Sequence, residues 1–388
     1  MTGNQRRRLP WVLMLLGALM ALYALGMLLQ TGNMLQYCAL APEAGEKGEN
    51  LKALADSARK LGDSMKDTFA WTAIGGTCGT VTLSSESSSA EAELIAMGEG
   101  WLEIYPRFLV RGRRIGESEL QQGAAVIMLD EDLAFSLFGT ELPEDAAVIL
   151  NNVTFQVVGT VRHGGSRSGR RGVGDTVAFD AYVPLLTVVA NEVPLKMLML
   201  SVLPQDNSGA AQIFRENAMQ WLAGGEMIDL QKEAMRRTVL PRILLLIVGL
   251  YAMVGLFRRM ARLASKWFDS YMQSLKGSYF TALIPRLLGT VAMTLLGFGA
   301  LIGATYLLML FSVQPLYVFT EWVPENIVEW TSIARVFWNL TAEAARPVRI
   351  GSRELRVVEF WGGLLRWGVI MLLLGAALLP KARRPQKR

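Results

Sequence analysis

Histidine and cysteine are nearly absent from this chain of 388 residues, which contains one His and two Cys. His163 has no second histidine, and Cys38 and Cys78 lack the spacing of metal ligands. These absences exclude the common zinc constellations and argue against a histidine-based catalytic triad. The pattern G-x-x-x-x-G-K-[ST], whose backbone and lysine hold nucleotide phosphates, is also missing. The chain is therefore predicted not to be an enzyme and to use no cofactor or metal.

Charge is missing from several long stretches, and hydrophobic residues make up 52% of the chain. A membrane-spanning helix needs roughly 20 mostly apolar residues. Residues 11–30 and 287–311 reach that length without a charge. Residues 238–257 and 360–379 are weaker candidates, because each carries an arginine a few residues inside one end. We therefore predict a membrane protein with four transmembrane α-helices.

These two arginines, Arg242 and Arg366, are predicted to lie near the same membrane surface. A long side chain in that place can extend to the lipid headgroups at modest cost. A buried ion partner is the alternative for each of them.

Charge near the ends of the spans predicts the orientation, because Lys and Arg collect on the cytoplasmic side. Residues 1–10 hold three Arg and no acid, 257–286 hold six basic residues and one acid, and 381–388 hold five basic residues and no acid. Residues 31–239 instead hold 18 basic and 27 acidic residues, and 312–357 hold five of each. We expect a multi-pass protein of the cytoplasmic membrane with both termini in the cytoplasm.

The first span has an alternative interpretation as a cleaved signal peptide. RRR precedes the apolar run, and Ala39-Leu40-Ala41 has the form of a cleavage site. The run is longer than the usual apolar region of about 7 to 15 residues in a signal peptide, which favours a retained anchor.

The chain divides into residues 1–30, a cytoplasmic N-terminus with the first span, residues 31–237, and the membrane region 238–388. The middle segment is long and mixed in pattern, which predicts a large α+β extracytoplasmic domain between helices 1 and 2. The expected elements are an amphipathic helix at 51–68, a strand or hairpin at 71–83, a short helix at 91–98, a strand from 124, a helix ending at Gly139, two strands in AAVILNN and TFQVVGTV, and an exposed loop at 163–174.

Cys38 and Cys78 both fall in the segment assigned to the oxidising side of the membrane. A single disulfide between them is a candidate, with two free thiols as the alternative.

Residues 99–185 carry a family resemblance. The run YPRFLVRGRRIGESELQQGAAVIMLDEDLAFSLFG, followed by TFQVVGTV and DAYVPL, resembles the MacB-like periplasmic core domain of MacB/FtsX-type ABC transporter permeases. The resemblance covers about a quarter of the chain and concerns structural residues, so it implies the fold more than the cargo. It also implies a separate ABC ATPase subunit and a dimer, either with a second copy or with another permease.

The membrane half departs from the family pattern. Where members often carry R-x-x-E-I-G-x-x-K/R-A-x-G-A, this chain reads RRMARLASKWFDSYMQSLKGSYF, and the family's acidic C-terminal motif is missing. This segment is basic and aromatic, with Trp267, Phe268 and Tyr271 on roughly one helical face. Together with Arg262 these residues are the candidate ATPase contact, and binding to anionic membrane lipid is the alternative.

Between the third and fourth spans, apolar residues recur at helical spacing over 327–340. They predict a helix lying on the outer membrane surface, with a binding groove as the alternative.

We therefore expect the permease subunit of an ABC-type transport or mechanotransmission system, which couples a separate ATPase to movement of its outer domain. The alternative is a non-transporting scaffold or signalling protein whose outer domain binds or activates a cell-envelope partner. No nucleic-acid partner is expected.

Overall fold

The structure is a computed structural model. It describes residues 3–41, 68–86, 88–139, 145–163, 179–191, 193–205, 209–222, 224–275, 280–318, 329–345 and 350–378, together with positions 53, 56, 57, 60, 63 and 64. Most of the helix predicted at 51–68, and the loop predicted after His163, lie outside these residues. The chain forms two compact units.

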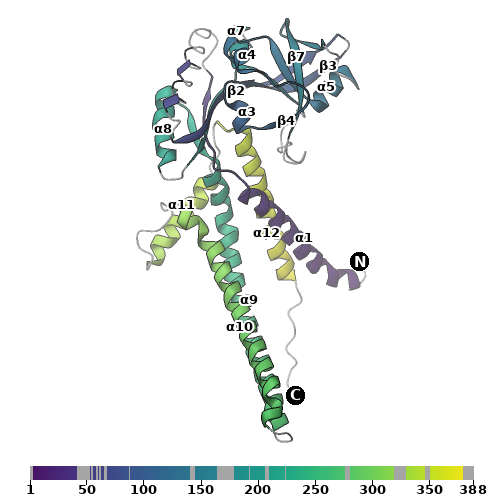
Figure 1. Cartoon of the computed structure of the whole chain (residues 1–388), viewed down its shortest axis with the longest axis vertical. Helices are drawn as coiled ribbons and strands as arrows, with labels where there is room; N and C mark the ends of the chain where they lie inside the picture. Colours follow the sequence, from purple (N-terminus) through teal and green to yellow (C-terminus); the bar gives the residue numbers. More distant parts are fainter. Residues whose placement is uncertain are drawn as a thin grey trace. The chain divides into compact units, whose positions relative to one another are not determined.

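The outer unit comprises Met27–Ala234 together with Pro347–Gly363. Its described residues form a ten-stranded mixed sheet with the order β10-β1-β9-β2-β3-β8-β5-β7-β4, and β6 pairs with β2 and β7 (Figure 1). The strands are β1 (Leu35–Leu40), β2 (Phe69–Ser84), β3 (Ser89–Met97), β4 (Arg107–Gly112), β5 (Val126–Asp130), β6 (Ala147–Leu150), β7 (Val153–His163), β8 (Asp180–Pro184), β9 (Met197–Pro204) and β10 (Glu226–Asp229). The helices are α3 (Trp101–Ile104), α4 (Glu117–Gln122), α5 (Glu131–Phe138), α7 (Leu185–Ala190) and α8 (Ala210–Trp221).

The predicted strand at 71–83 is confirmed as β2, and the series after residue 124 is confirmed as β5, α5, β6 and β7. Gly139 ends α5, as predicted, and its N–H donates to the carbonyl of Phe135. The hairpin between β6 and β7 turns on Asn151 and Asn152, which have φ values of 48° and 64°. Two positive φ values are what a two-residue hairpin turn requires, and Asn tolerates them.

The short helix predicted at 91–98 is wrong, because these residues belong to strand β3. Their Ala and Glu content favours a helix, but β3 pairs antiparallel with β2 and parallel with β8. Burial alternates from Glu91 to Leu94, and the residues from Leu94 to Met97 are all buried, as expected of a strand that enters the interior of a sheet covered on both faces. Pairing on both edges therefore overrides the local preference.

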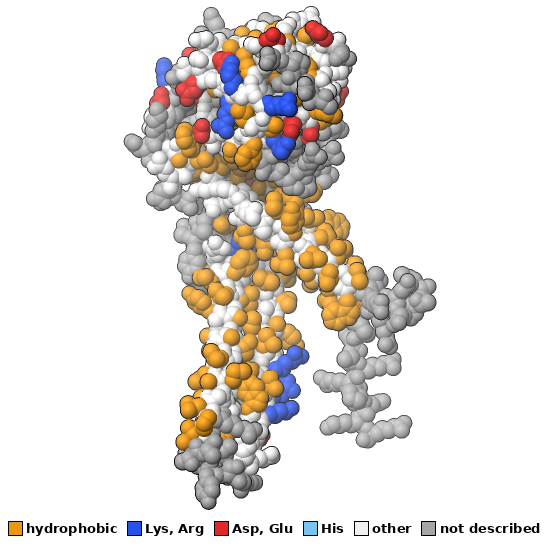
Figure 2. Space-filling model, turned by 45° about the vertical axis from the view of Figure 1, so that its right-hand side comes forward, with side chains coloured by type: hydrophobic (Ala, Val, Ile, Leu, Met, Phe, Trp, Pro, Cys, Tyr) orange, Lys and Arg blue, Asp and Glu red, His pale blue; other side chains and the backbone are white. Residues whose placement is uncertain are grey.

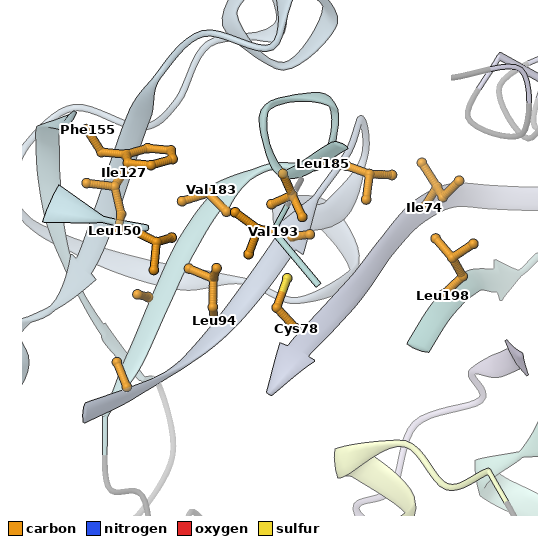
Figure 3. Close-up of a cluster of buried hydrophobic side chains, with 14 of the residues drawn as sticks. Ile74, Cys78, Leu94, Ile127, Leu150, Phe155, Val183, Leu185, Val193 and Leu198 are labelled. Atoms are coloured by element: carbon orange, nitrogen blue, oxygen red, sulfur yellow. The ribbon is translucent and has the colours of Figure 1, made fainter. Parts of the chain in front are cut away.

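The core of the outer unit fills the space between the sheet and its helices. Figure 3 shows apolar side chains from several strands converging there, among them Leu94, Ile127, Phe155, Val183 and Leu198. Helix α8 is joined to this core by the ring of Phe214, which meets that of Phe69 edge-on at 6.0 Å. The domain therefore has a continuous core of its own.

Of the two alternatives for the cysteines, the structure has the free thiols and not the candidate disulfide, because Cys38 and Cys78 are both buried and unbonded. Cys38 lies on β1 and Cys78 on β2, and β9 pairs with both strands and separates them. Strands that are separated by one other strand lie about 9 to 10 Å apart in a sheet. A disulfide can bridge Cα atoms only up to roughly 7 Å apart. Burial raises the pKa of both thiols, that of Cys78 to about 12, so both remain protonated.

The second unit consists of helices: α1 (Gly3–Leu29), α9 (Leu230–Leu275), α10 (Phe280–Val318), α11 (Trp330–Ala345) and α12 (Arg353–Leu378), the ends of α1, α9 and α12 belonging to the outer unit. Among the described residues, four helices are long and apolar enough to cross a membrane, namely α1, α9, α10 and α12. Figure 2 shows hydrophobic side chains covering the visible surface of the helical part. The helix expected between the third and fourth spans is present as α11.

Helices α9 and α10 form a long antiparallel hairpin (Figure 1). The rings of Phe257 and Phe298 stack at 5.9 Å, and Gly249 and Gly297 face the side chains of Leu308 and Met260. Small residues at such places allow apolar helices to approach closely.

Arg242 in this hairpin does not reach outward as predicted, because it is 1% exposed. Its contacts are also not the ion pair of the alternative, since it donates to a backbone carbonyl and an amide oxygen of α10.

Candidate functional site at the start of helix α12

Helix α12 begins inside the outer unit, at a well-defined N-terminal cap. Ser352 is fully buried, its Oγ accepts the N–H of Leu355 at 3.2 Å, and its carbonyl accepts the N–H of Arg356. A serine that bonds the third following N–H is a common helix cap. Leu355 is buried, and so is Val358 about one turn later. One face of the first part of α12 is therefore packed inside the outer unit.

Arg353, the first residue of α12, makes the main charged contact of this site. Its Nη1 donates to Oδ1 of Asp180 on β8 at 2.8 Å and lies 3.9 Å from Oε2 of Glu93 on β3. The Asp180 side chain is 2% exposed and that of Arg353 is 20% exposed. Breaking such a shielded pair is costly, because a charge is then left in a poorly hydrated place.

A tyrosine and a second arginine complete the surroundings of Asp180. The hydroxyl of Tyr182 donates to Oδ2 of Asp180 at 3.2 Å, and Nε of Arg107 donates to that hydroxyl at 2.8 Å. Burial raises the pKa of Tyr182, so its hydroxyl keeps the proton that it donates. Both oxygens of Asp180 are therefore occupied.

Glu354, the next residue of α12, joins a buried polar chain that starts on β1. Nε2 of Gln36 donates to Oε2 of Glu354 at 3.1 Å and to the hydroxyl of Tyr105 at 2.7 Å. That hydroxyl lies 2.7 Å from Oγ of Ser201 on β9. Burial, and secondarily the nearby charge of Glu354, raise the pKa of Tyr105.

The segment before α12 is tied to the sheet as well, because the N–H of Ile350 donates to Oε2 of Glu226 on β10 at 3.2 Å. The start of α12 therefore contacts β1, β3, β8 and β10. An open cleft of about 510 Å³ lies beside it, lined by Thr77, Glu93, Met197, Gly351, Arg353, Leu355, Arg356 and Glu359. Carboxylates and arginines here neutralise one another, and the described residues contain no group of three or more potential metal ligands. The hydrogen bonds and ion pairs to several strands attach the start of α12 to the sheet.

The predicted ATPase-contact residues lie elsewhere, on the last part of α9. Arg262, Trp267 and Phe268 are exposed, and Nε of Arg262 donates to the carbonyl of Arg258 at 3.3 Å. Tyr271 differs from them, because it is 4% exposed and faces inward. Arg262, Trp267 and Phe268 are therefore available to a partner. The three aromatic residues do not share one exposed face, because Tyr271 is buried while Trp267 and Phe268 are exposed.

Sequence reasoning missed the residues that anchor α12. From the sequence alone, DAYVPL indicates only a strand, and Arg353 is only one of the five basic residues of segment 312–357. Two features of the sequence could have indicated this contact. An acid, Asp180, begins the strand DAYVP, and the charged run GSRELR comes directly before an apolar span.

Comparison with known proteins identifies the outer unit. A family model for the MacB-like periplasmic core domain matches residues 31–214. No match was found among curated proteins. The resemblance drawn from residues 99–185 is confirmed, and with it the prediction of a membrane-embedded protein that has an α+β outer domain.

Solved structures with some similarity include three domains of membrane proteins. The extracellular domain of the noncanonic ABC-type transporter YknZ from Gram-positive bacteria is 14% identical, covers 47% of this chain and 94% of its own, and has a TM-score of 0.34. The periplasmic region of MacB from Actinobacillus actinomycetemcomitans is 18% identical, covers 51% of this chain and 89% of its own, and has a TM-score of 0.37. A domain of a putative permease protein from Porphyromonas gingivalis is 11% identical, covers 50% of this chain and 85% of its own, and has a TM-score of 0.32. The domain assignment rests on the family model and not on these superpositions.

Proposed function

We propose that this chain, whose residues 31–214 match the MacB-like periplasmic core domain, is a MacB/FtsX-type ABC transporter permease that couples a separate ATPase to movement of its outer domain. ATP is hydrolysed by the partner subunit, and the permease works either in transport or in mechanotransmission. The active assembly contains two permeases, as a homodimer or a heterodimer. Four helices cross the cytoplasmic membrane, and both termini lie in the cytoplasm.

The connections between strands and helices support this proposal. Helix α1 ends at Leu29 and β1 begins at Leu35, while β10 ends at Asp229 and α9 begins at the next residue. Strands β1 and β10 are paired, with Leu35 opposite Asp229. Asp229 also caps α9, since its Oδ1 accepts the N–H of Lys232 at 2.9 Å. A displacement of either helix therefore acts on neighbouring strands of one sheet.

The attachment of α12 to the sheet is the single observation that carries the proposal. Arg353 holds α12 to β8, and Glu354 holds it to β1. Since α9 follows β10 directly and α1 is joined to β1 by the short segment 30–34, three of the four apolar helices in the described part of the chain are connected to the sheet. A sheet joined to helices at three places moves with them as one body, so that a change between two helix arrangements in the membrane is passed on to the outer domain.

The contact with the ATPase is assigned to the exposed residues near the end of α9. Trp267 is 36% exposed and Phe268 45% exposed, and Figure 2 shows Lys and Arg side chains gathered on the same hairpin. Aromatic and basic side chains can enter an acidic cleft of a partner, where desolvated aromatic anchors dominate binding. The same residues also suit contact with anionic lipid, which we retain as the competing role.

Replacing Trp267 and Phe268 together with alanine is expected to abolish recovery of the ATPase with the purified permease. Two desolvated aromatic anchors are commonly worth about 2 kcal/mol each, so affinity falls by roughly 1,000-fold if the two losses add. Leu256→Ala is the control, because it removes another exposed apolar side chain of α9, about 16 Å along the helix. Full ATPase recovery with the double variant would leave lipid as the partner of this segment.

A second candidate function is binding of an envelope protein, and strand β4 favours it. This strand is an edge of the sheet, paired only with β7 among the described residues. Phe108 is 67% exposed, with Leu109 and Val110 at 40% and 38%. The run RFLVRGRR has four arginines and no acid. An acidic, partly apolar segment of a partner could add to this edge as another strand.

Phe108→Asp is expected to remove such an envelope partner from pull-downs while the ATPase is still recovered. The change removes the most exposed apolar side chain of the edge, places a charge there, and weakens the attraction of the edge for an acidic segment. Phe135→Asp, at a residue of α5 that is 62% exposed, is the matched control. An envelope protein recovered without any ATPase, and lost only with Phe108→Asp, would favour the second function over the first.

A further inference from the structure

The sequence places one proline on each helix of the α9–α10 hairpin, Pro241 on α9 and Pro315 on α10. Gly249 packs against Leu308, and Arg242 contacts Phe311 and Gln314. Continuing this antiparallel register by one residue brings Pro241 of α9 to the level of Pro315 of α10. Each proline lies within a helix, where the ring removes one N–H donor and weakens the helix locally.

The missing donors leave two carbonyl groups without their usual helical partner. Pro241 cannot donate to the carbonyl of Arg237, and Pro315 cannot donate to that of Phe311. Apolar helices tolerate proline when a neighbouring helix supplies the lost hydrogen bond, because lipid cannot. A donor from outside α10 is therefore expected at Phe311.

Arg242 supplies that donor. Its Nη1 lies 2.8 Å from the carbonyl oxygen of Phe311 and 3.3 Å from Oε1 of Gln314. The guanidinium also lies over the Phe311 ring, 4.5 Å from its centroid. Arg242, the residue after Pro241, thus supplies the hydrogen bond that Pro315 cannot donate to the carbonyl of Phe311. Among the residues that the structure describes, Nε and Nη2 of Arg242 have no hydrogen-bond partner, so no described carboxylate explains why this arginine is buried.

We propose that Pro241 and Pro315 form a paired hinge across the hairpin and that Arg242 is the positioning residue that holds it at one angle. The hinge lies a short distance along α9 from Asp229, where the helix leaves the sheet. Resting on the proposed function, the hinge lets the long remainder of the hairpin change direction without breaking the capped junction between β10 and α9. Arg242 stabilises the hinge by bridging α9 and α10 next to the two prolines.

A double-mutant cycle in the purified full chain tests the pairing of Arg242 with Pro315. Arg242→Met is expected to lower the melting temperature by about 3 to 8 °C, as expected for a lost hydrogen bond from a charged group. In Pro315→Ala the backbone N–H returns, so the same Arg242→Met change is expected to cost less than half as much. Arg242→Lys keeps one charged donor and is expected to fall between. Arg366→Met, at an exposed arginine of α12, is the control and is expected to change little.

An equal loss on Arg242→Met in the unmodified chain and in the Pro315→Ala variant would overturn the assignment. It would mean that Arg242 acts through its bulk or charge alone and not through the carbonyl that proline leaves unfilled.

The hinge itself is tested by spin labels at Phe135→Cys on α5 and Leu295→Cys on α10, which are 62% and 68% exposed. Cys38 and Cys78 are buried and serve as the unlabelled background. Arg242→Met is expected to broaden the distance distribution, and Pro315→Ala to narrow it again. Unchanged distributions in both variants would refute the hinge. The measurement needs no ATPase, so its result is independent of whether the proposed coupling is correct.

Discussion

Replacing Asp180 with alanine is expected to destabilise the outer domain by about 3 kcal/mol, the largest effect of any single side-chain truncation at the α12 site. Asp180 is fully shielded and accepts hydrogen bonds from Arg353 and Tyr182. Without it, Arg353 keeps its charge in a place that is only 20% exposed, with Glu93 at 3.9 Å as the remaining acid. For a domain of this size the loss corresponds to a fall in melting temperature of roughly 6 to 12 °C.

Two companion variants separate the charge from the packing. Asp180→Ala with Arg353→Met removes both charges, and part of the lost stability should return, because an apolar pair replaces an unpaired charge. Glu131→Ala breaks the ion pair with Arg162, whose N–O distance is 2.6 Å but whose side chains are 62% and 38% exposed. That control should change the melting temperature little, since water replaces an exposed pair. A small effect of Asp180→Ala would show that the pair does not hold α12.

The functional consequence of the same change follows from the proposed coupling. If α12 transmits movement through Arg353, the Asp180→Ala permease should still bind its ATPase, because the exposed residues near the end of α9 are untouched. We then expect ATP hydrolysis to continue, while the movement of the outer domain that accompanies each hydrolysis event becomes smaller. Loss of ATPase binding instead would indicate that the outer domain is needed for assembly.

The fold was largely predictable wherever local pattern and tertiary structure agree. Gly139 ends α5 because glycine accepts the backbone conformation that follows the helix, and AAVILNN gives a strand and its turn in one run. Strand β3 could not be predicted in this way, since its Ala and Glu residues favour a helix until β2 and β8 pair with it. The apolar spans were visible from length and charge, but α9 continues well beyond residue 257 because basic residues do not break a helix.

The anchoring site was not predictable from local patterns, because its partners are distant in sequence. Arg353 meets Asp180 across 173 residues, and Glu354 meets Gln36 across 318 residues. Neither arginine nor glutamate at the start of a helix is unusual, so only the folded sheet distinguishes these charges from solvated ones. Arg242 illustrates the same limit, since its role depends on a proline in another helix.

The packing of α1 against α12 leads to the second large prediction, which concerns Gly368. A Cβ at Gly368 would lie 2.8 Å from the backbone nitrogen of Ala21 and 2.9 Å from the carbonyl oxygen of Gly17. A Cβ at Gly17 would in turn lie 2.7 Å from the carbonyl oxygen of Gly368. Backbone atoms cannot turn aside as a flexible side chain can, so any larger residue must push the two helices apart. Close contact through small residues is what holds apolar helices together in lipid.

Gly368→Leu is therefore expected to cost about 3 kcal/mol or more and to lower the melting temperature of the full chain by roughly 6 °C or more. Gly363→Leu is a matched control on the same helix, because a Cβ there meets no atom within 4 Å. Leucine at that position should be neutral or slightly stabilising, since it favours the helix more than glycine does. Gly368→Ala should fall between the two, because it adds only the Cβ. If both leucine variants melt together with the unmodified chain, α1 and α12 are not packed through Gly368, and α12 is then held at its outer end alone.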